Sequence, residues 1–435
     1  MKLKNKNVLV YGLSLSGEWC AKLLKKYKAN VFLYDDDYER LKVKTIKNVY
    51  ILPKLNKEII SNFDFIVVSP SIEPDNKNLE IARSLYKKIY SEVEFASLFC
   101  KKFIAITGTN GKTTTVQLVT AMLNEKYDAI ACGNIGYPLS RAVLQNKKYL
   151  KVVEVSSFML ENCKSFSPHI ATVLNIQPDH LLRHKSIENY KKTKLKIFDN
   201  LKPSDYAIIN LDNDINTVES CKKITYSINK LADVCVKNGY IYIFNKQFMA
   251  IKDLKLKGKH NLYNILCAIC CAVIYKVSAS KIKEALNNFI VEKYRIESVG
   301  NCNQRNFVND SKSTNIASTL ASTETVKGPI ILLLGGSNKG LDYKELFTKL
   351  TKRVKQIFAF GEITSDLVNA NNDKFKLTTC KDMYQAFDMA TESSKPQDTI
   401  LLSPASASYD QFANYIERGK AFDEKVKEYA ENFKK

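Results

Sequence analysis

The chain has 435 residues, of which 45% are hydrophobic, and a formal net charge of +21 from 66 basic and 45 acidic residues. At about 100–200 residues per domain this length predicts three domains, and the composition excludes a largely disordered chain. Because no run of five or six like charges and no arginine–aromatic stripe occurs, a lysine-rich surface is favoured over nucleic-acid binding.

The cysteines and the N-terminus indicate the compartment. Eleven cysteines without paired C-x₂-C spacing indicate free thiols in a reducing cytoplasm. Cys267, Cys270 and Cys271 have helical spacing in an apolar stretch too short to cross a bilayer, and only His260 lies near, so core packing is favoured over a metal site. No signal-peptide cleavage pattern follows the first apolar run. We therefore expect a cytoplasmic protein without membrane insertion.

A βαβ nucleotide-site pattern opens the chain. Its strand, turn, helix and second strand are expected at 6–11, 12–17, 18–27 and 31–34. Asp35, after the second strand, could hold a ribose hydroxyl as in dinucleotide enzymes. Ser14 stands where those enzymes carry their middle glycine, which favours a looser diphosphate or uridine-type ligand. Another buried strand, 63–70, ends in a Ser-Pro loop.

A phosphate loop begins the second unit. An apolar run from Phe103 breaks into a loop with Gly108 and Gly111, followed by Lys112 and Thr113. Glycine N–H groups can cradle phosphate oxygens, the lysine can reach the β- and γ-phosphates, and the threonine hydroxyl can join a Mg²⁺ shell. The first glycine lies one position closer to the lysine than in the general pattern. The alternative is an ordinary strand-to-helix turn with an exposed lysine.

Polar residues at later strand ends extend this site. Glu154 ends a strand at 150–155 and is placed to hold Mg²⁺ with the loop threonine; the alternative is an exposed carboxylate. His180 follows Asp179 after a strand at 170–175, where a metal or phosphate ligand is expected, although a loop histidine is often only solvated. We also expect a helix at 113–125 directly after the phosphate loop, a helix at 186–198 and strand-like runs within 204–251. A long apolar helix is expected to begin within 258–264.

The third unit begins near residue 293, so we expect domains at 1–91, 92–292 and 293–435. Its strands are expected at 306–310, 330–336, 356–360 and 398–402, with a helix-start cluster at 311–315 and a loop at 403–412. Strands alternate with helices throughout, which predicts an α/β protein.

The motifs, in this order, resemble those of the Mur ligases over essentially the whole chain. They lie at 107–113, 133–136, 154–158, 179–180, 190–194, 260–261, 309–315 and 402–412. The resemblance implies a Rossmann-like N-terminal domain, a central phosphate-loop ATPase domain and a Rossmann-like C-terminal domain. It also implies ATP-dependent amide formation through an acyl phosphate, by a monomer in peptidoglycan precursor synthesis. The D-glutamate-adding branch is most similar, which implies UDP-N-acetylmuramoyl-L-alanine and D-glutamate as substrates.

The resemblance also implies site residues. The catalytic residues would be Lys112, His180, Lys194 and Lys312. Two Mg²⁺ ions would be held by Thr113, Glu154, His180 and a carbamylated Lys194. ATP would be bound by Gly108, Thr109, Asn110, Gly111, Lys112, Thr113, Thr114, Asn261, Asn264, Arg295 and Asp310, with the third domain closing during catalysis. The substrates would be bound by Leu13, Ser14, Asp35, Asn134, Ser156, Thr314, Lys339, Ser408, Tyr409 and Tyr415.

Lys339, Thr314 and Ser408 would suit an anionic amino acid, because they are cationic and hydroxyl donors. No Asp-Asn-Pro-Arg run, which would receive a distal amine, occurs in the chain. Two positions depart from the family: Leu182 stands where an acid is common, and Ser71 where a glycine is usual.

Two other functions compete with this one. A folylpolyglutamate synthetase shares the loop and the fold but begins at the ATPase domain, without a preceding nucleotide-site pattern. A phosphate-loop ATPase could instead act as a switch for an anionic partner. Phosphate release that depends on both an amino acid and a UDP-sugar separates a ligase from such a switch.

Overall fold

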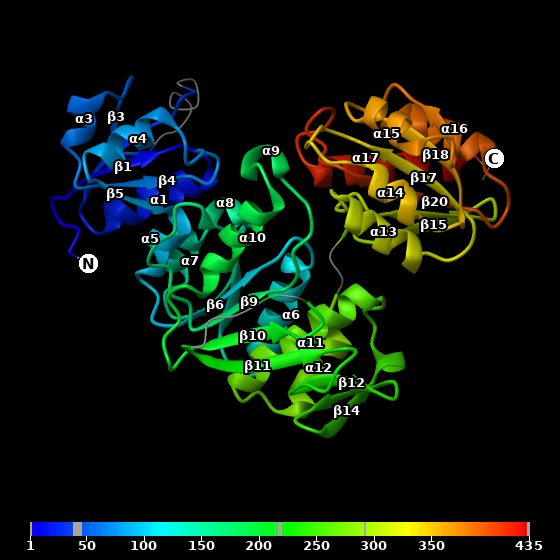
Figure 1. Cartoon of the computed structure of the whole chain (residues 1–435), viewed down its shortest axis with the longest axis horizontal. Helices are drawn as coiled ribbons and strands as arrows, with labels where there is room; N and C mark the ends of the chain where they lie inside the picture. Colours follow the sequence, from blue (N-terminus) through cyan, green and yellow to red (C-terminus); the bar gives the residue numbers. More distant parts are fainter. Residues whose placement is uncertain (1, 38–45, 214, 216–219, 291–292, 433–435) are drawn as a thin grey trace. The chain divides into compact units, whose positions relative to one another are not determined.

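The computed structural model describes residues 2–37, 46–213, 215, 220–290 and 293–432. The strands of three sheets alternate with helices along most of the described chain (Figure 1), which confirms the α/β prediction. The chain divides into two units, Met1–Ile176 with Glu188–Phe289, and Gln177–Ile187 with Ile290–Lys435. No helix of the described residues is long and apolar enough to cross a membrane.

The first sheet has five parallel strands in the order β3-β2-β1-β4-β5. Its elements are β1 (Asn7–Tyr11), α1 (Leu15–Lys26), β2 (Asn30–Tyr34), β3 (Tyr50–Ile51), α3 (Lys57–Ser61), β4 (Phe65–Val68), α4 (Lys77–Ser84), β5 (Lys88–Ser91) and α5 (Glu92–Ser97). Helix α1 begins at Leu15, three residues before the predicted start, because Ser14 already has the extended backbone of an N-cap residue.

The second sheet has nine strands in the order β14-β13-β12-β11-β10-β9-β6-β8-β7. Its strands are β6 (Phe103–Thr107), β7 (Ala129–Gly133), β8 (Leu150–Glu154), β9 (Ile170–Val173), β10 (Tyr206–Asn210), β11 (Lys222–Ser227), β12 (Val234–Lys237), β13 (Tyr240–Ile243) and β14 (Lys246–Ala250). The last three form an antiparallel ribbon, which agrees with the strand-like runs expected within 204–251, and strands do not alternate with helices at this edge. Short Asn- and Gly-containing turns join its strands and leave no room for crossover helices.

Helices flank this sheet. They are α6 (Lys112–Asn124), α7 (Leu139–Gln145), α8 (Ser157–Leu160), α10 (Ile187–Leu195), α11 (Lys259–Ile274) and α12 (Ala279–Asn288), with 3₁₀ turns η1 (Lys196–Phe198) and η2 (Ile251–Asp253). The short helix α9 (Leu181–His184) belongs to the second unit. Helices α6 and α11 pack against each other and against β6 in one apolar core. Cys267, Cys270 and Cys271 are fully buried there, which confirms their prediction as core residues.

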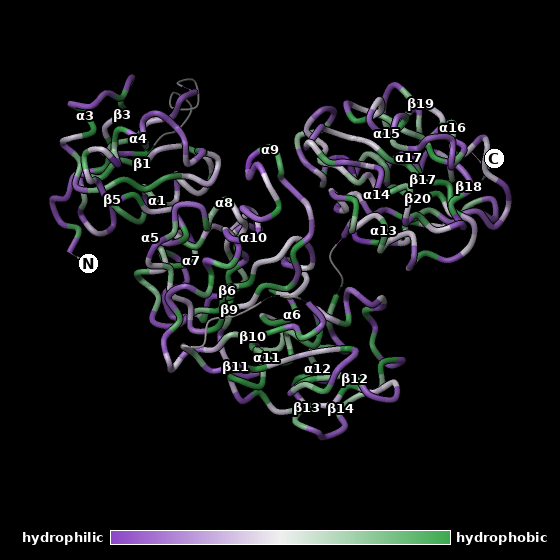
Figure 2. Tube along the Cα trace, viewed as in Figure 1, coloured by the Kyte–Doolittle hydropathy of each residue, from purple (hydrophilic) through white to green (hydrophobic). Residues whose placement is uncertain are grey.

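The third sheet has the order β15-β16-β20-β17-β18-β19, parallel except for β15. Its elements are β15 (Glu297–Cys302), β16 (Arg305–Asn309), α13 (Ile316–Thr325), β17 (Ile330–Gly335), α14 (Lys344–Lys349), β18 (Val354–Phe360), α15 (Thr364–Asn371), β19 (Lys376–Thr379), α16 (Met383–Ser393), β20 (Thr399–Ala405) and α17 (Tyr415–Asn432). Figure 2 shows its central strands as hydrophobic.

Strand β20 corrects one prediction, because it continues through Pro404 to Ala405 instead of ending at Leu402. Ala405 pairs with Gly335 across a register irregularity, and a proline is tolerated at such a place because no regular ladder bond is required from it. The predicted boundary at 292/293 falls on residues outside the described ranges.

The predicted boundary at 91/92 lies between β5 and α5, and the apolar core there is continuous. Buried residues of the first sheet, such as Val67, share one cluster with Phe95 of α5 and with Val153 of the second sheet. Two buried glutamates of α5, Glu92 and Glu94, connect this helix to segments beside the second sheet. Glu94 Oε1 accepts the N–H groups of Lys164 and Ser165 at 2.9 and 2.6 Å. Glu92 Oε1 accepts the N–H of Ser140 in α7 at 2.7 Å, while Glu92 Oε2 has no hydrogen-bond partner. Burial raises the pKa of Glu92 to about 6, despite the bonds from Ser140.

The Glu92 carboxyl should make stability depend on pH. Its pKa is raised above the ordinary 4.5, so its stabilising contribution is complete below pH 4.5 and is lost as pH rises through 6. Glu92→Gln retains the acceptor for Ser140 and removes the buried charge. We expect this variant to be more stable than wild type by about 2 kcal/mol at pH 8 and equal to it at pH 4.5.

Urea unfolding across this pH range measures the difference, with Glu73→Gln, an exposed acid in the same unit, as the control. A pH-independent difference, or a destabilised Glu92→Gln at pH 8, would contradict the assignment.

Candidate active site

The phosphate loop joins β6 to α6 and depends on a glycine. Gly111 is the N-cap of α6 with φ +82°, and a Cβ there would lie 2.3 Å from Asn264 Oδ1. Glycine is therefore required both by the backbone conformation and by the approach of α11. The first turn of α6, which begins at Lys112, directs N–H groups and the positive end of the helix dipole toward the loop. This is the geometry of an anion site.

Three side chains donate hydrogen bonds to the carbonyl groups of the loop. One is at the end of the loop itself, and two come from distant segments. Lys112 Nζ donates to Gly108 O at 2.9 Å and to Thr109 O at 2.8 Å. Asn175, after β9, donates from Nδ2 to Asn110 O at 3.0 Å and accepts the Asn110 N–H at 2.9 Å. Lys194 of α10 donates to Gly108 O at 2.9 Å. The shape of the loop is thus set by three side chains, of which Asn175 was missed by the sequence analysis.

Lys194 is the most deeply buried of the predicted catalytic residues, with 1% of its surface exposed. Its Nζ lies 3.4 Å from Thr107 Oγ1 and 4.6 Å from the centre of the Tyr190 ring. The Tyr190 hydroxyl lies 3.3 Å from Thr109 Oγ1. Helix α10 therefore directs both side chains at the phosphate loop, as their spacing of one turn predicts.

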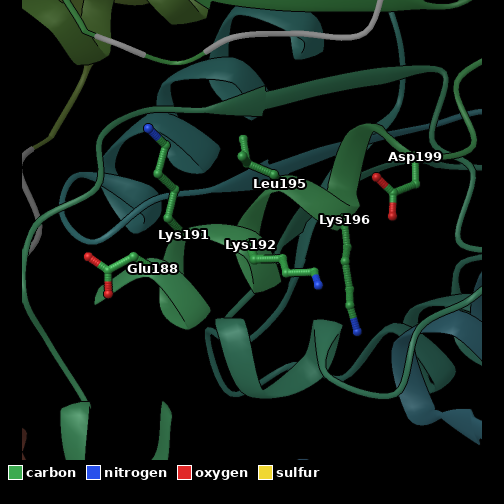
Figure 3. A pocket seen from close by; sticks show the side chains of 6 residues that line it. All are labelled: Glu188, Lys191, Lys192, Leu195, Lys196 and Asp199. Atoms are coloured by element: carbon green, nitrogen blue, oxygen red, sulfur yellow. The ribbon is translucent and has the colours of Figure 1, made fainter. Parts of the chain in front are cut away.

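A pocket of about 410 Å³ lies on the same segment, and Figure 3 shows the side chains that line it. It is lined by Glu188, Lys191, Lys192, Leu195, Lys196 and Asp199. Lys194 is not among these residues. The pocket belongs to the outer surface of α10 and η1, and we assign no ligand to it.

Glu154 has the surroundings of a metal ligand. It is buried at the end of β8, paired with Ile106 of β6 immediately before the phosphate loop. Its Oε1 accepts from Asn134 Nδ2 at 2.9 Å, whereas its Oε2 has no hydrogen-bond partner. The Thr114 Oγ1 is also buried without a partner. Buried oxygens of this kind suit a hard cation, so the residues present fit Mg²⁺.

No cluster of three His, Cys, Asp or Glu side chains that could hold a metal exists among the described residues. A Mg²⁺ ion at Glu154 would therefore need hydroxyl and nucleotide phosphate oxygens as well, which is the usual way proteins bind this ion.

Asn261 and Asn264 are buried on one face of α11, as predicted. Asn264 Nδ2 lies 3.3 Å from Asn261 Oδ1, and Asn261 donates to Lys257 O at 2.8 Å. Ser156 instead caps α8, because its Oγ accepts the Met159 N–H at 3.3 Å.

In the first sheet, Asp35 organises the turn after β1. Its Oδ2 accepts the Leu13 N–H at 2.6 Å. Ser14 Oγ lies 3.2 Å from Ser69 Oγ, which in turn donates to Gly12 O at 2.6 Å. The structure thus brings Leu13, Ser14 and Asp35 together at the carboxyl edge of the sheet, where open α/β sheets bind ligands.

The second unit contains the remaining predicted residues. His180 has φ +54°, a left-handed conformation rarely adopted by residues other than glycine and often associated with functional sites. Its N–H donates to Asp179 Oδ1 at 2.9 Å. Lys339 Nζ donates to Asp179 Oδ1 at 3.1 Å and to Thr314 O at 3.2 Å. The structure therefore joins the His180 segment to two residues predicted to bind the amino acid.

Asp310 and Arg295 differ in their hydrogen bonding: the Asp310 carboxylate accepts several hydrogen bonds, whereas the buried Arg295 Nε makes none within the described chain. Asp310 is buried and accepts from Ile296 N, Ser322 Oγ and Ser403 Oγ. Burial raises the pKa of the Asp310 carboxyl, against the lowering effect of serine hydroxyls and Arg295. The Nε of Arg295 is buried without a hydrogen-bond partner. Asp310 therefore holds its own loop together.

The loops after β16 and β20 carry the other predicted residues. Lys312 Nζ lies 5.4 Å from the centre of the Tyr415 ring. Ser408 is buried, and its carbonyl accepts from Phe412 N, while Tyr409 is 75% exposed.

Arg418 of α17 is a central residue of this unit that the sequence analysis missed. Its guanidinium is fully buried and donates to Ser311 Oγ at 3.0 Å, Ser311 O at 2.9 Å, Ser406 O at 3.0 Å and Ala407 O at 3.2 Å. Burial lowers the pKa of Arg418 to about 9. It ties together the loops that contain Lys312 and Ser408. The sequence carries one indication that this part of α17 is closely packed: a glycine, Gly419, follows Arg418 in a helix rich in charged residues.

Comparison with known proteins identifies the family. Residues 106–272 match the Mur ligase middle domain, and residues 294–406 match the Mur ligase glutamate ligase domain. A UDP-N-acetylmuramoylalanine–D-glutamate ligase from Thermoanaerobacter pseudethanolicus is 36% identical over 452 residues, covering 98% of this chain and 99% of the relative. The chain belongs to the Mur ligase family. The resemblance predicted from the motifs is thereby confirmed.

Other relatives of this Mur ligase agree. The protein of the same name from Aquifex aeolicus is 34% identical, covering 96% of this chain and 98% of its own. Among solved structures, the UDP-N-acetylmuramate–alanine ligase of Thermotoga maritima aligns with a TM-score of 0.62 at 15% identity, covering 98% and 100% of the two chains. The MurF ligase of the same organism, in complex with ADP, aligns at 0.61 and 15%, covering 99% and 97%. These structures show the shared three-domain fold.

Lys112→Ala should abolish turnover without unfolding this Mur ligase, because its ammonium lies at the phosphate loop and not in an apolar core. We expect kcat to fall at least about 1,000-fold. ATP-dependent phosphate release measures this, and circular dichroism monitors folding. Lys101→Ala, an exposed lysine just before β6, is the control and should match wild type. Near wild-type activity of Lys112→Ala would refute the phosphate-loop assignment.

Proposed function

We propose that this Mur ligase uses ATP to join D-glutamate to UDP-N-acetylmuramoyl-L-alanine in cytoplasmic peptidoglycan precursor synthesis, acting as a monomer. The observation that carries the proposal is the similarity to UDP-N-acetylmuramoylalanine–D-glutamate ligases at 34–36% identity over nearly the full length of both chains. The phosphate loop, with Lys112 at its end and the buried Lys194 beside it, supports the ATP-dependent part.

The reaction has two steps. A substrate carboxylate oxygen attacks the γ-phosphorus and displaces ADP, giving an acyl phosphate. The amine of D-glutamate then attacks the carbonyl carbon, the C–O bond to phosphate breaks, and the nitrogen loses a proton. Charge gathers on the phosphoryl oxygens and the carboxylate together, so positioned cations and N–H groups supply most of the stabilisation. Lys112 and the first turn of α6 are arranged for that.

Two Mg²⁺ ions would neutralise phosphate charge and polarise the phosphoryl group. Thr113 and Glu154 would hold the first, consistent with the unpartnered Glu154 Oε2. His180 and Lys194 would hold the second. An ammonium repels a cation, so Lys194 would need to be carbamylated to become an oxygen ligand.

The remaining assignments follow the same proposal. Asn261 and Asn264 contact adenine, and Lys312 and Arg295 contact the phosphates. Asp310 acts through its loop, since its carboxylate is used by serine hydroxyls and a backbone N–H. The UDP-substrate is bound by Leu13, Ser14, Asp35, Asn134 and Ser156, and D-glutamate by Thr314, Lys339, Ser408, Tyr409 and Tyr415.

The proposal is tested by phosphate release with ATP, Mg²⁺ and UDP-N-acetylmuramoyl-L-alanine against D-glutamate, L-glutamate, L-lysine and diaminopimelate. Hydrogen-bonding pockets discriminate strongly when a buried partner is left unpaired, so we expect D-glutamate to exceed L-lysine by at least about 10⁴ in kcat/KM. Comparable rates with lysine or diaminopimelate would contradict the proposal. So would phosphate release without an amino acid or without the UDP-sugar.

Lys194→Ala tests the carbamate separately. We expect it to be nearly inactive and to be partly rescued by formate or acetate, which can supply the missing oxygen ligand. Lys192→Ala, an exposed lysine on the same helix, should retain wild-type activity. Mass spectrometry of the native protein under CO₂ gives a second readout. Full activity of Lys194→Ala without added carboxylate would exclude the role.

A further inference from the structure

An ion pair occupies the place assigned to the amino acid. Lys339 Nζ and Asp179 Oδ1 lie 3.1 Å apart, with 13% and 7% of their side-chain surfaces exposed. The Lys339 ammonium also donates to Thr314 O, and Asp179 Oδ1 also accepts the His180 N–H. Residues 160 positions apart in sequence are therefore held together where solvent has little access.

A second contact fixes the same two segments. Gly340, next to Lys339, has φ +67°, and a Cβ there would lie 2.8 Å from the side chain of Leu182. The segment 177–187 and the turn after β17 thus meet at two neighbouring points. The ion pair is part of a packed arrangement and does not depend on one flexible lysine.

Charge balance limits what can bind here. A carboxylate that reaches Lys339 competes with Asp179 for the same ammonium. If Lys339 leaves Asp179 and no other ammonium replaces it, this shielded carboxylate keeps its contacts with His180, the N–H at 2.9 Å and the imidazole Nε2 at 3.6 Å, but loses the lysine ammonium, which is unfavourable. An amino acid carries both a carboxylate and an ammonium, so it can supply a partner to each member of the pair.

We propose that the Asp179–Lys339 pair holds the place of the amino-acid zwitterion. Lys339 takes a carboxylate of the substrate, and Asp179 takes its α-ammonium. The inference rests on the proposed assignment of Lys339 to the amino acid and adds the amine contact. It makes Asp179 a specificity-determining residue, because a dicarboxylate without an amine takes Lys339 from Asp179 and supplies no ammonium in its place.

Glutarate provides the test, since it has the carboxylates of glutamate and no amine. The KM for D-glutamate and the competitive inhibition constant of glutarate are measured for wild type and Asp179→Asn. In wild type we expect glutarate to bind at least about 100-fold more weakly than D-glutamate. In Asp179→Asn the KM for D-glutamate should rise at least about tenfold, the loss of one charge-assisted hydrogen bond, while glutarate binds as well as before or better.

Three results would overturn the inference. Equal weakening of both ligands would mean that Asp179 only orients Lys339. Equal tightening would mean that it only competes for Lys339. No change in either binding constant would mean that it does neither. If Asp179→Asn turns over too slowly, calorimetric titration of both ligands into the full chain with ADP and UDP-substrate gives the same comparison.

Two controls separate the causes. Asp342→Asn removes an exposed carboxylate three residues from Lys339 and should change neither constant. The KM for ATP should also stay unchanged in Asp179→Asn. A wild-type protein that does not use D-glutamate fails the proposed function. A protein that uses D-glutamate, but whose Asp179→Asn variant keeps the preference over glutarate, fails this inference alone.

Discussion

The phosphate-loop site depends on the hydrogen bonds that the carbonyl groups of the loop accept. A loop that offers N–H groups to phosphate must direct its carbonyls elsewhere, and buried carbonyls need donors. Lys112 and Lys194 share Gly108 O, Lys112 also binds Thr109 O, and Asn175 binds Asn110 O. These donors come from α6, α10 and the end of β9. The loop is therefore held from two helices and the end of one strand, and two lysines predicted to be catalytic stabilise it.

A related arrangement holds the loops after β16 and β20 in the second unit, which the proposal assigns to the amino acid. Arg418 binds backbone carbonyls of Ser406 and Ala407 and both the hydroxyl and carbonyl of Ser311. A fully buried guanidinium is stable only because so many acceptors surround it. In both units a buried basic side chain, Lys194 or Arg418, donates to backbone carbonyls and so fixes the shape of a loop.

The sequence predicted the parts of this protein that depend on local pattern. Buried strands such as β6, β8 and β17 are continuous apolar runs, and the glycine loop has a recognisable spacing. Contacts between distant residues were not predictable. Asn175 resembles any polar residue after a strand, and Arg418 lies in a helix rich in charged residues. The sequence around Asp179 does not indicate that it pairs with Lys339. Such pairings arise only from tertiary packing, which a single sequence does not display.

The central claim is that ATP activates a substrate carboxylate through an acyl phosphate. UDP-N-acetylmuramoyl-L-alanine labelled with ¹⁸O in both carboxylate oxygens tests it most directly, by mass spectrometry of the released phosphate. One labelled oxygen attacks the γ-phosphorus and leaves with it when the amine displaces phosphate. The account therefore predicts phosphate containing one ¹⁸O and an amide containing the other. Unlabelled phosphate, with both labelled oxygens retained on the UDP-substrate, would contradict it.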